Sequence, residues 1–266
     1  MSKRLPVKKT YKLYIGGAFP RSESGRTYEA QGQNVARGSR KDLRDAVRAA
    51  RTAQPGWAGA TAYNRGQVVY RIAEMLEARR ADFAALCSGE AEVDRSVDRL
   101  VWYAGWADKL AQVIGGTNPV AGPYFNFTIQ EPTGVVGILA PDEPALEGLV
   151  SRVAPAIVGG NATVVVASEP HPLAAVELGE VLATADVPDG VVNLLTGQRD
   201  ELAPWLAGHM DVNAIDVTGA DGLAPELEKL AAENVKRVVR GTHTDQSPWE
   251  IAAFLELKTV WHPIGT

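Results

Sequence analysis

Cysteine is almost absent from this sequence, since Cys87 is the single one among 266 residues. One cysteine cannot form a disulfide within the chain, so we exclude a disulfide-stapled scaffold and expect a reducing compartment. The sequence also lacks an apolar run near the roughly 18 residues that a membrane-spanning helix needs. Its first residues, MSKRLPVKK, contain no apolar stretch of the kind that a secretory signal requires. We therefore expect a cytoplasmic protein that does not contact a membrane.

An excess of positive charge is lacking as well. The chain has 27 Lys and Arg against 32 Asp and Glu, a formal net charge of -5. A nucleic-acid-binding surface usually needs a basic excess, so we expect no nucleic acid partner. The histidines show no spacing typical of metal ligands, so we predict no metal site and interpret them as surface or capping residues. These are His171, His209, His243 and His262.

The first part of the chain is predicted to be helical after a short hairpin. YKLYIGGAF at 11–19 places a Gly-Gly turn after β-forming residues, which indicates a hairpin. A helix over 39–54 is expected to begin after Ser39 as N-cap, with Leu43, Val47 and Ala50 on one face. Two further helices are expected over about 62–89 and about 92–114, and nothing in this part indicates chemistry.

From residue 133 onward, short β-branched runs alternate with amphipathic stretches. The runs are GVVGILA, ATVVVAS, VVNLL, VNAIDV and VKRVV. Strands that alternate with helices predict an α/β fold with a doubly wound, Rossmann-like parallel sheet covered on both faces. Two other segments, YFNFTIQ and FLELKTVWHPIG, alternate in the manner of strands that lie outside this sheet.

Several ordered blocks of the sequence resemble NAD(P)-dependent aldehyde dehydrogenases. They include KLYIGGAFPRSESGRTYEA, EPTGVVGILAP, APAIVGGNATVVVASEPHPLAAVELGEVL, VPDGVVNLLTG, VTGA and ENVKRV, and the resemblance resumes at KTVWHPIG. It implies a nucleotide-binding domain whose N-terminal helical part is 1–115 and whose sheet is 133–241. It further implies an arm strand at 116–132, and a bridge with a C-terminal arm strand at 242–266. The family's catalytic domain has no counterpart in this chain, so we expect it to be absent.

The resemblance also implies where the nucleophile and the general base of the family would be. Cys87 lies in the helical part, far from that place, and we interpret it as a small apolar residue rather than a nucleophile. The family's general-base glutamate follows KRV, where this chain has Arg240, Gly241 and Thr242. Asp245 follows outside any matching motif, so no carboxylate is expected to activate water or a thiol.

The turn that carries the family's oxyanion donor departs in the same way. Asp142 and Glu143 stand where the family has Trp-Asn. A carboxylate beside a developing oxyanion would repel it, which is the reverse of what an oxyanion hole requires. With the nucleophile and the base also lost, we predict no catalytic residue.

The cofactor site implied by the resemblance is only partly retained. Its candidate residues are Ser168, Glu169, Thr218 and Gly219. Val166 replaces the family's ribose-binding lysine, and Ala224 replaces a second glycine. Asp221 adds negative charge in the first turn of the following helix, where it opposes a pyrophosphate. We expect no cofactor, or NAD(P) bound weakly at most.

Both segments of the family's oligomerisation arm are kept, and this implies a partner. In the last strand, Leu257, Thr259 and Trp261 alternate with Glu256, Lys258, Val260 and His262, which favours one packing face and a free edge. We predict a catalytically inactive subunit that assembles with a full-length aldehyde dehydrogenase through the arm, as a structural or regulatory partner. Two alternatives stay open: an NAD(P)-binding sensor, and an oxidoreductase with residual aldehyde dehydrogenase activity.

Overall fold

Five short strands form the parallel sheet at the centre of the computed structural model, which describes residues 7–241 and 245–265. They are β6 (Val135–Leu139), β7 (Ala162–Val166), β8 (Val192–Leu195), β9 (Ala214–Asp216) and β10 (Arg237–Val239). Their order is β10-β9-β6-β7-β8, and each of the five predicted runs supplies one strand. The predicted fold class is therefore confirmed. The chain start at 1–6, Thr242 and His243 lie outside the described residues.

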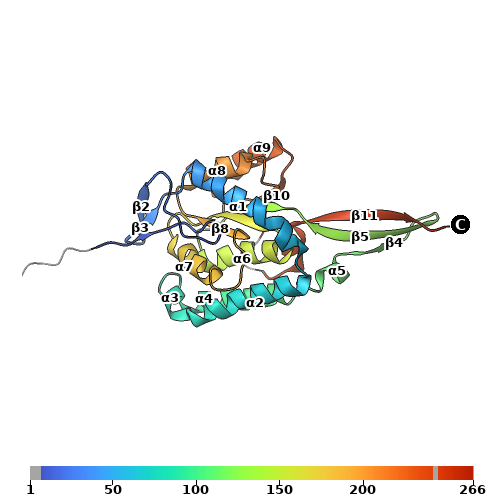
Figure 1. Cartoon of the computed structure of the whole chain (residues 1–266), viewed down its shortest axis with the longest axis horizontal. Helices are drawn as coiled ribbons and strands as arrows, with labels where there is room; N and C mark the ends of the chain where they lie inside the picture. The colour runs from blue at the N-terminus through green and yellow to red at the C-terminus, as the bar shows by residue number, and fades with distance from the viewer. Residues whose placement is uncertain (1–6, 242–244, 266) are drawn as a thin grey trace, which may run out of the picture.

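Helices cover both faces of this sheet (Figure 1). On one face lie α1 (Arg40–Gly59), α8 (Arg199–Gly208) and α9 (Ala224–Ala232). On the other lie α6 (Ala145–Val158) and α7 (Leu173–Leu182), with α2 (Ala62–Ala78) and α4 (Glu90–Ala104) packed against α6. Every residue of β6, β7, β8 and β9 is buried as a result. This burial explains why these strands read as continuous apolar runs.

The first predicted helix is confirmed at its start and is longer at its end. Ser39 caps α1, and Asp42 completes a capping box by accepting a hydrogen bond from the Ser39 amide. The two longer helices that we expected are each interrupted. The first ends at Ala78 and is followed by α3 (Arg80–Ala84), and the second ends before Gly105 and is followed by α5 (Leu110–Val113). The apolar periodicity of the sequence continues across both breaks, so it did not reveal where the helices end.

The predicted N-terminal hairpin has its turn at Gly16 and Gly17, whose φ values of 58° and 76° suit glycine. Ile15 and Ala18 exchange backbone hydrogen bonds across it. Tyr14 then bridges to Leu194, so this segment covers the β8 edge of the sheet. A small separate sheet is formed by β1 (Thr10–Tyr11), β3 (Gln33–Ala36) and β2 (Thr27–Ala30).

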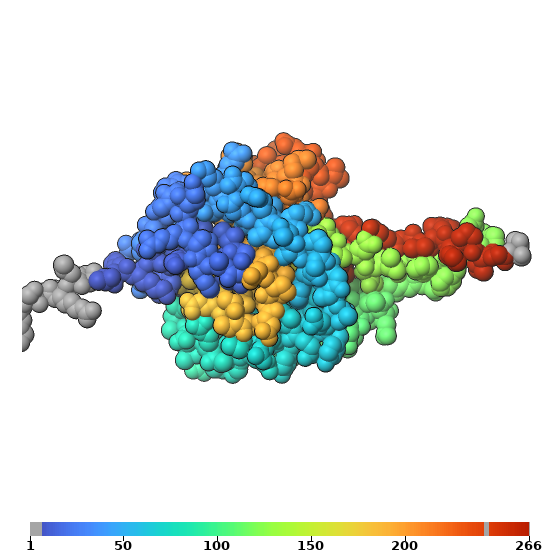
Figure 2. Space-filling model, in the orientation of Figure 1, coloured from blue at the N-terminus to red at the C-terminus, as the bar shows by residue number. Residues whose placement is uncertain are grey.

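A three-stranded antiparallel arm projects from the body (Figures 1 and 2). It consists of β11 (Leu255–Pro263), β5 (Tyr124–Pro132) and β4 (Gly116–Asn118), in the order β11-β5-β4. Its two long strands pair over nine positions, from Leu255 opposite Pro132 to Pro263 opposite Tyr124. Both segments that we predicted to lie outside the parallel sheet are thus strands of one arm. The division of the chain into domains stays a prediction.

A short helix, α10 (Pro248–Ala252), lies just before the arm strand β11. Ser247 caps it, and Ile251 and Phe254 are buried beneath it. Glu250 forms an ion pair with the fully buried Arg152 of α6, whose guanidinium also binds Asp216 at the end of β9. The bridge is therefore anchored to the core by charge as well as by apolar contact.

Candidate functional site

The strand order reverses between β6 and β9, because the chain runs outward from β6 to β8 and then returns to the other side of β6 at β9. In doubly wound sheets, ligands bind outside the carboxyl ends of the strands at this switch point. Residues 140–142 follow β6 here, and residues 217–219 follow β9. Ser168 and Glu169 follow β7, so all four predicted cofactor residues lie at this edge of the sheet.

The two segments at the switch point contact each other directly. The Gly219 amide donates to the carbonyl of Leu139 at 3.1 Å. A Cβ atom added to Gly219 would lie 2.4 Å from the carbonyl carbon and oxygen of Ala140. Glycine is thus required at this position by the close approach of two neighbouring backbone segments.

The Thr218 hydroxyl is used inside the protein. The amide and the hydroxyl of Thr218 donate to Oδ1 of Asp216 at 2.9 and 2.5 Å. The same hydroxyl accepts from the Gly241 amide at 2.9 Å. Thr218 therefore ties the end of β9 to the end of β10.

Ser168 and Glu169 are also occupied by local contacts. The Ser168 hydroxyl accepts from the His171 amide at 3.1 Å, which closes the turn after β7. The Glu169 carboxylate accepts from the Arg199 amide at 2.9 Å, at the first residue of α8. A carboxylate at a helix N-terminus is stabilising, so Glu169 acts here as a cap for α8.

Arg199 is the central side chain of this edge, and no pattern in the sequence had singled it out. Its Nη2 donates to the Ala140 carbonyl at 2.9 Å and to Oδ1 of Asp142 at 2.5 Å. Its Nη1 donates to Oδ2 of Asp142 at 3.3 Å and to Oδ2 of Asp221 at 3.2 Å. Arg199 is only 7% exposed. Its position shortly after the VVNLL run was the one available signal, since residues there reach the switch point.

These contacts correct the electrostatic argument made from the sequence. We counted Asp142 and Asp221 as negative charge without a partner cation in view, and the structure pairs both with Arg199. Asp221 also does not lie in the first turn of α9. It begins the short 3-10 helix η1 (Asp221–Leu223) with a left-handed φ of 47°, and α9 follows from Ala224.

Val166 is fully buried at the end of β7. It belongs to the same apolar cluster as Leu139, Ala220 and Ala224. A lysine at this position would have to place its charge in that cluster, or displace it.

A shallow depression of about 430 Å³ lies beside Arg199. Its lining residues are Tyr28, Glu29, Ala30, Asp142, Glu169, Pro170 and Arg199. Three carboxylates and one guanidinium line the depression, and both Nη atoms of that guanidinium already have partners. Burial raises the pKa of the Tyr28 hydroxyl, and Glu169 adds to the shift. Nε of Arg199 and the Tyr28 hydroxyl are buried without a hydrogen-bond partner among the described residues, but three carboxylates line the same depression. The residues present therefore do not fit the negatively charged phosphates of a dinucleotide.

The positions that the resemblance assigned to catalysis carry no catalytic group in the described part of the chain. Burial, with a smaller contribution from Glu92, raises the pKa of the Cys87 thiol to about 11, so the nucleophilic thiolate is scarce at neutral pH. Arg240 pairs with Glu228 at the surface. A Cβ atom on Gly241 would overlap the Arg152 guanidinium, so this position cannot carry a general base without rearrangement.

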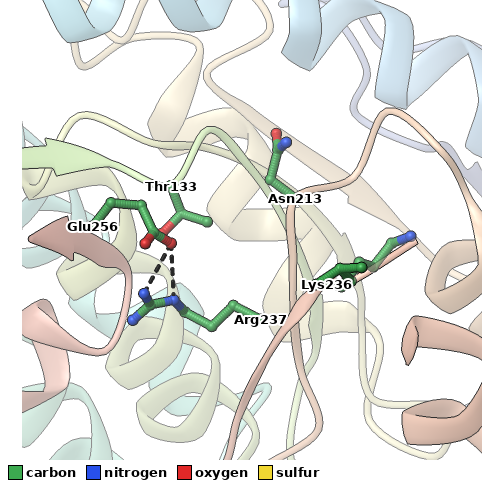
Figure 3. A pocket seen from close by; sticks show the side chains of 6 residues that line it. Thr133, Asn213, Lys236, Arg237 and Glu256 are labelled. Atoms are coloured by element: carbon green, nitrogen blue, oxygen red, sulfur yellow. Dashed lines mark hydrogen bonds and ion pairs between the residues drawn. The ribbon is translucent and has the colours of Figure 1, made fainter. Parts of the chain in front are cut away.

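A larger depression, of about 520 Å³, lies at the opposite edge, where β6, β9 and β10 begin (Figure 3). Arg237 is paired there with Glu256 at 2.8 Å. The Lys236 ammonium points away from this pair and donates to the Asn234 side chain. Burial lowers the pKa of Lys236 to about 8, against a smaller opposing effect of Glu233. Because Arg237 and Lys236 bind neighbouring side chains and do not point together into the depression, we assign no site to it.

Within residues 7–241 and 245–265, no group of three His, Cys, Asp or Glu side chains could hold a metal ion. Over the same ranges, no helix combines the length and the apolar character needed to cross a membrane.

Comparison with known proteins gives one consistent family. The model of the aldehyde dehydrogenase family matches residues 26–242. The chain is 33% identical over 248 residues to "Aldehyde dehydrogenase, cytosolic 1" of Elephantulus edwardii, covering 85% of this chain and 49% of that protein. It is 34% identical over 255 residues to "Retinal dehydrogenase 2" of Gallus gallus, covering 88% and 48%.

Solved structures agree with the sequence comparison. An NAD+ complex of aldehyde dehydrogenase from Bacillus cereus has a TM-score of 0.79 at 27% identity, over 86% of this chain and 50% of that one. HpcC from Thermus thermophilus has a TM-score of 0.81 at 28% identity, over 87% and 48%. The chain spans about half the length of the curated relatives it matches.

The close approach at the switch point predicts that Gly219→Ala is destabilising. The new methyl group would overlap the Ala140 backbone, which cannot rotate away, so we expect a loss of about 3 kcal/mol in unfolding free energy. Gly222→Ala is the control, because nothing lies within 4 Å of a Cβ there, and we expect a change within about 0.5 kcal/mol. Urea unfolding measures both, and equal losses would show that the segments do not touch.

The lowered pKa of Lys236 predicts that the difference in stability between the wild type and Lys236→Met depends on pH. Below pH 8 the folded protein carries a buried charge, whereas between about 8 and 10.5 the unfolded chain keeps a proton that the folded state has released. Raising the pH through this window therefore stabilises the wild type relative to Lys236→Met. We expect the substituted protein to be the more stable at pH 7, and the gap in urea midpoint to narrow at pH 10. A gap that is constant with pH would contradict the burial of this amine.

Proposed function

Since the chain belongs to the aldehyde dehydrogenase family, we propose that it is a subunit without aldehyde oxidation of its own. In this proposal it assembles with a full-length aldehyde dehydrogenase through its arm, in a structural or regulatory role. The observation that carries the proposal is the exposed apolar surface of the arm, combined with a sheet edge whose candidate residues bind other groups of the same chain.

The strand register defines two faces of the arm. Because paired residues share a face, Val260 lies opposite Phe127 and beside Phe125 and Ile129. Phe125 and Ile129 are 48% and 41% exposed, and the Phe125 and Phe127 rings lie 5.3 Å apart. This face, which we call the aromatic face, gathers Phe125, Phe127, Ile129 and Val260, whereas the sequence alone indicated the face of Leu257, Thr259 and Trp261 for packing.

The second face of the arm has a polar centre. Asn118 donates to Asn126 at 2.7 Å and to Thr128 at 3.2 Å, and Thr128 lies 3.4 Å from Thr259. Trp261, which is 58% exposed, packs edge-on against Tyr124 at the tip. Apolar side chains thus meet solvent on both faces of a thin arm, an arrangement that favours cover by another chain.

The outer edge of β11 supports the same proposal. In the order β11-β5-β4, β11 is an edge strand, and its paired side is taken by β5 over nine residues. Its other side can extend a sheet of a partner, as the resemblance to the family's oligomerisation arms implies. Lys258 and Glu131 form a surface ion pair on the aromatic face, next to Ile129.

The two alternative functions receive less support. An NAD(P)-binding sensor would need several free donors at the switch point, where Thr218, Gly219 and both Nη atoms of Arg199 are engaged within the protein. Residual oxidation would need a thiolate next to a base, and the raised pKa of Cys87 opposes that.

The purified chain is expected to show no NAD(P)-dependent oxidation of aldehydes. The reason is the lack of an activated nucleophile and of a general base among the described residues, and absorbance of the reduced nicotinamide measures it. Turnover that Cys87→Ala abolishes would identify Cys87 as a nucleophile and overturn the proposed inactivity. Turnover that survives this substitution would indicate a different chemistry and would overturn it equally.

The arm is expected to mediate assembly with the full-length enzyme. Ile129→Asp places a charge on the aromatic face and should release the chain from a co-expressed aldehyde dehydrogenase of the same organism. Because Ile129 is 41% exposed in the free chain, the unfolding free energy should fall by no more than about 1 kcal/mol. Met210→Asp, at a position 75% exposed on the body, is the matched control and should still co-elute.

Size-exclusion chromatography with light scattering distinguishes the outcomes. Full co-elution of the Ile129→Asp protein, and also of a chain lacking residues 256–266, would exclude the arm as the link. An intact chain that runs alone beside the full-length enzyme would refute the partner proposal itself.

A further inference from the structure

One residue joins the segments that follow four of the five parallel strands. Arg199 itself comes after β8, and its amide binds Glu169, which comes after β7. Its guanidinium binds Ala140 and Asp142, which come after β6, and Asp221, which comes after the turn that ends β9. The switch point predicted for a ligand is thus crossed by a side chain of the protein.

The chemistry of this cluster is the opposite of a phosphate site. A dinucleotide needs donors or cations directed into open space, whereas the guanidinium here is directed at two carboxylates and a carbonyl. One positive charge faces Asp142 and Asp221, and Glu169 is adjacent, so the negative charges outnumber it.

We infer that the Arg199 side chain fills the switch-point crevice and holds its two sides together, so that a nucleotide cannot enter. We call this set of contacts the lock. It holds together the segments after β6 and β9, which would have to part before a dinucleotide could enter. NAD(P) is thus excluded by contacts that Arg199 makes, rather than by the loss of a binding residue such as the lysine replaced by Val166. The inference deepens the proposed function, but its test measures ligand binding and is independent of whether the arm binds a partner.

The lock is tested by removing its charges. In Arg199→Gly/Asp142→Asn/Asp221→Asn, the guanidinium and both carboxylates that hold it are gone. We expect calorimetric titration to give an affinity for NAD at least tenfold above that of the wild type. The matched control is Arg37→Gly/Glu201→Gln, which removes a second ion pair at the start of α8 that does not cross the crevice. We expect no gain in the control.

The single variant Arg199→Gly separates the lock from a nucleotide ligand. It leaves Asp142 and Asp221 facing the space of the guanidinium, so methylguanidinium at millimolar concentration should raise its melting temperature, whereas NAD should not. Wild-type protein that binds NAD with low micromolar affinity, and loses it in Arg199→Gly, would show that Arg199 is a phosphate ligand and would overturn the inference. A folded triple variant without a tenfold gain would overturn it as well.

A second measurement covers the case in which the triple variant does not fold. Arg199→Lys keeps one positive charge but cannot span both carboxylates. We expect hydrogen exchange of the amides in 139–142 and 217–223 to be at least tenfold faster in Arg199→Lys than in the wild type, with exchange in β7 unchanged. Equal exchange rates in both segments would show that Arg199 does not hold them together.

Discussion

The guanidinium of Arg199 is the constraint on which the carboxyl edge of the sheet depends. Parallel strands of three to five residues leave their following segments close together, and the polar groups there must be satisfied within the protein. Arg199 meets this need with charge-assisted hydrogen bonds to Asp142 and Asp221. On the opposite face of the sheet, Arg152 performs the corresponding task with Asp216 and Glu250. The charged side chains at this edge are therefore used for structural contacts within the protein.

This use of charge determines what the edge can do. Ser168, Glu169, Thr218 and Gly219 all lie where the family resemblance places the cofactor, yet each is bound within the chain. Local contacts thus explain their presence without a nucleotide. The arm shows the reverse arrangement, because its Tyr124, Phe125 and Trp261 side chains are 42% to 58% exposed. A carboxyl edge whose polar groups are engaged within the chain, together with an exposed apolar arm, supports the proposal that the subunit acts by binding another protein.

The sequence was sufficient for the fold because the signals that define it are local. Runs such as ATVVVAS and VVNLL carry their β-branched residues continuously, and Ser39 marks a helix start by its own side chain. The switch-point cluster has no such signal, since Arg199 is separated from Asp142 by 57 residues and from Asp221 by 22. The aromatic face was hidden for a similar reason. Alternation in β11 alone gives two faces, and only its register with β5 shows which face gathers Phe125, Phe127 and Ile129 beside Val260.

The closed carboxyl edge is the central claim, and a crystal structure grown with millimolar NAD tests it most directly. We expect the Arg199 guanidinium between Asp142 and Asp221, the Gly219 amide on the Leu139 carbonyl, and no density for a dinucleotide outside the ends of β6 and β9. A nucleotide bound there, with Arg199 swung out or resting on its phosphates, would contradict the claim.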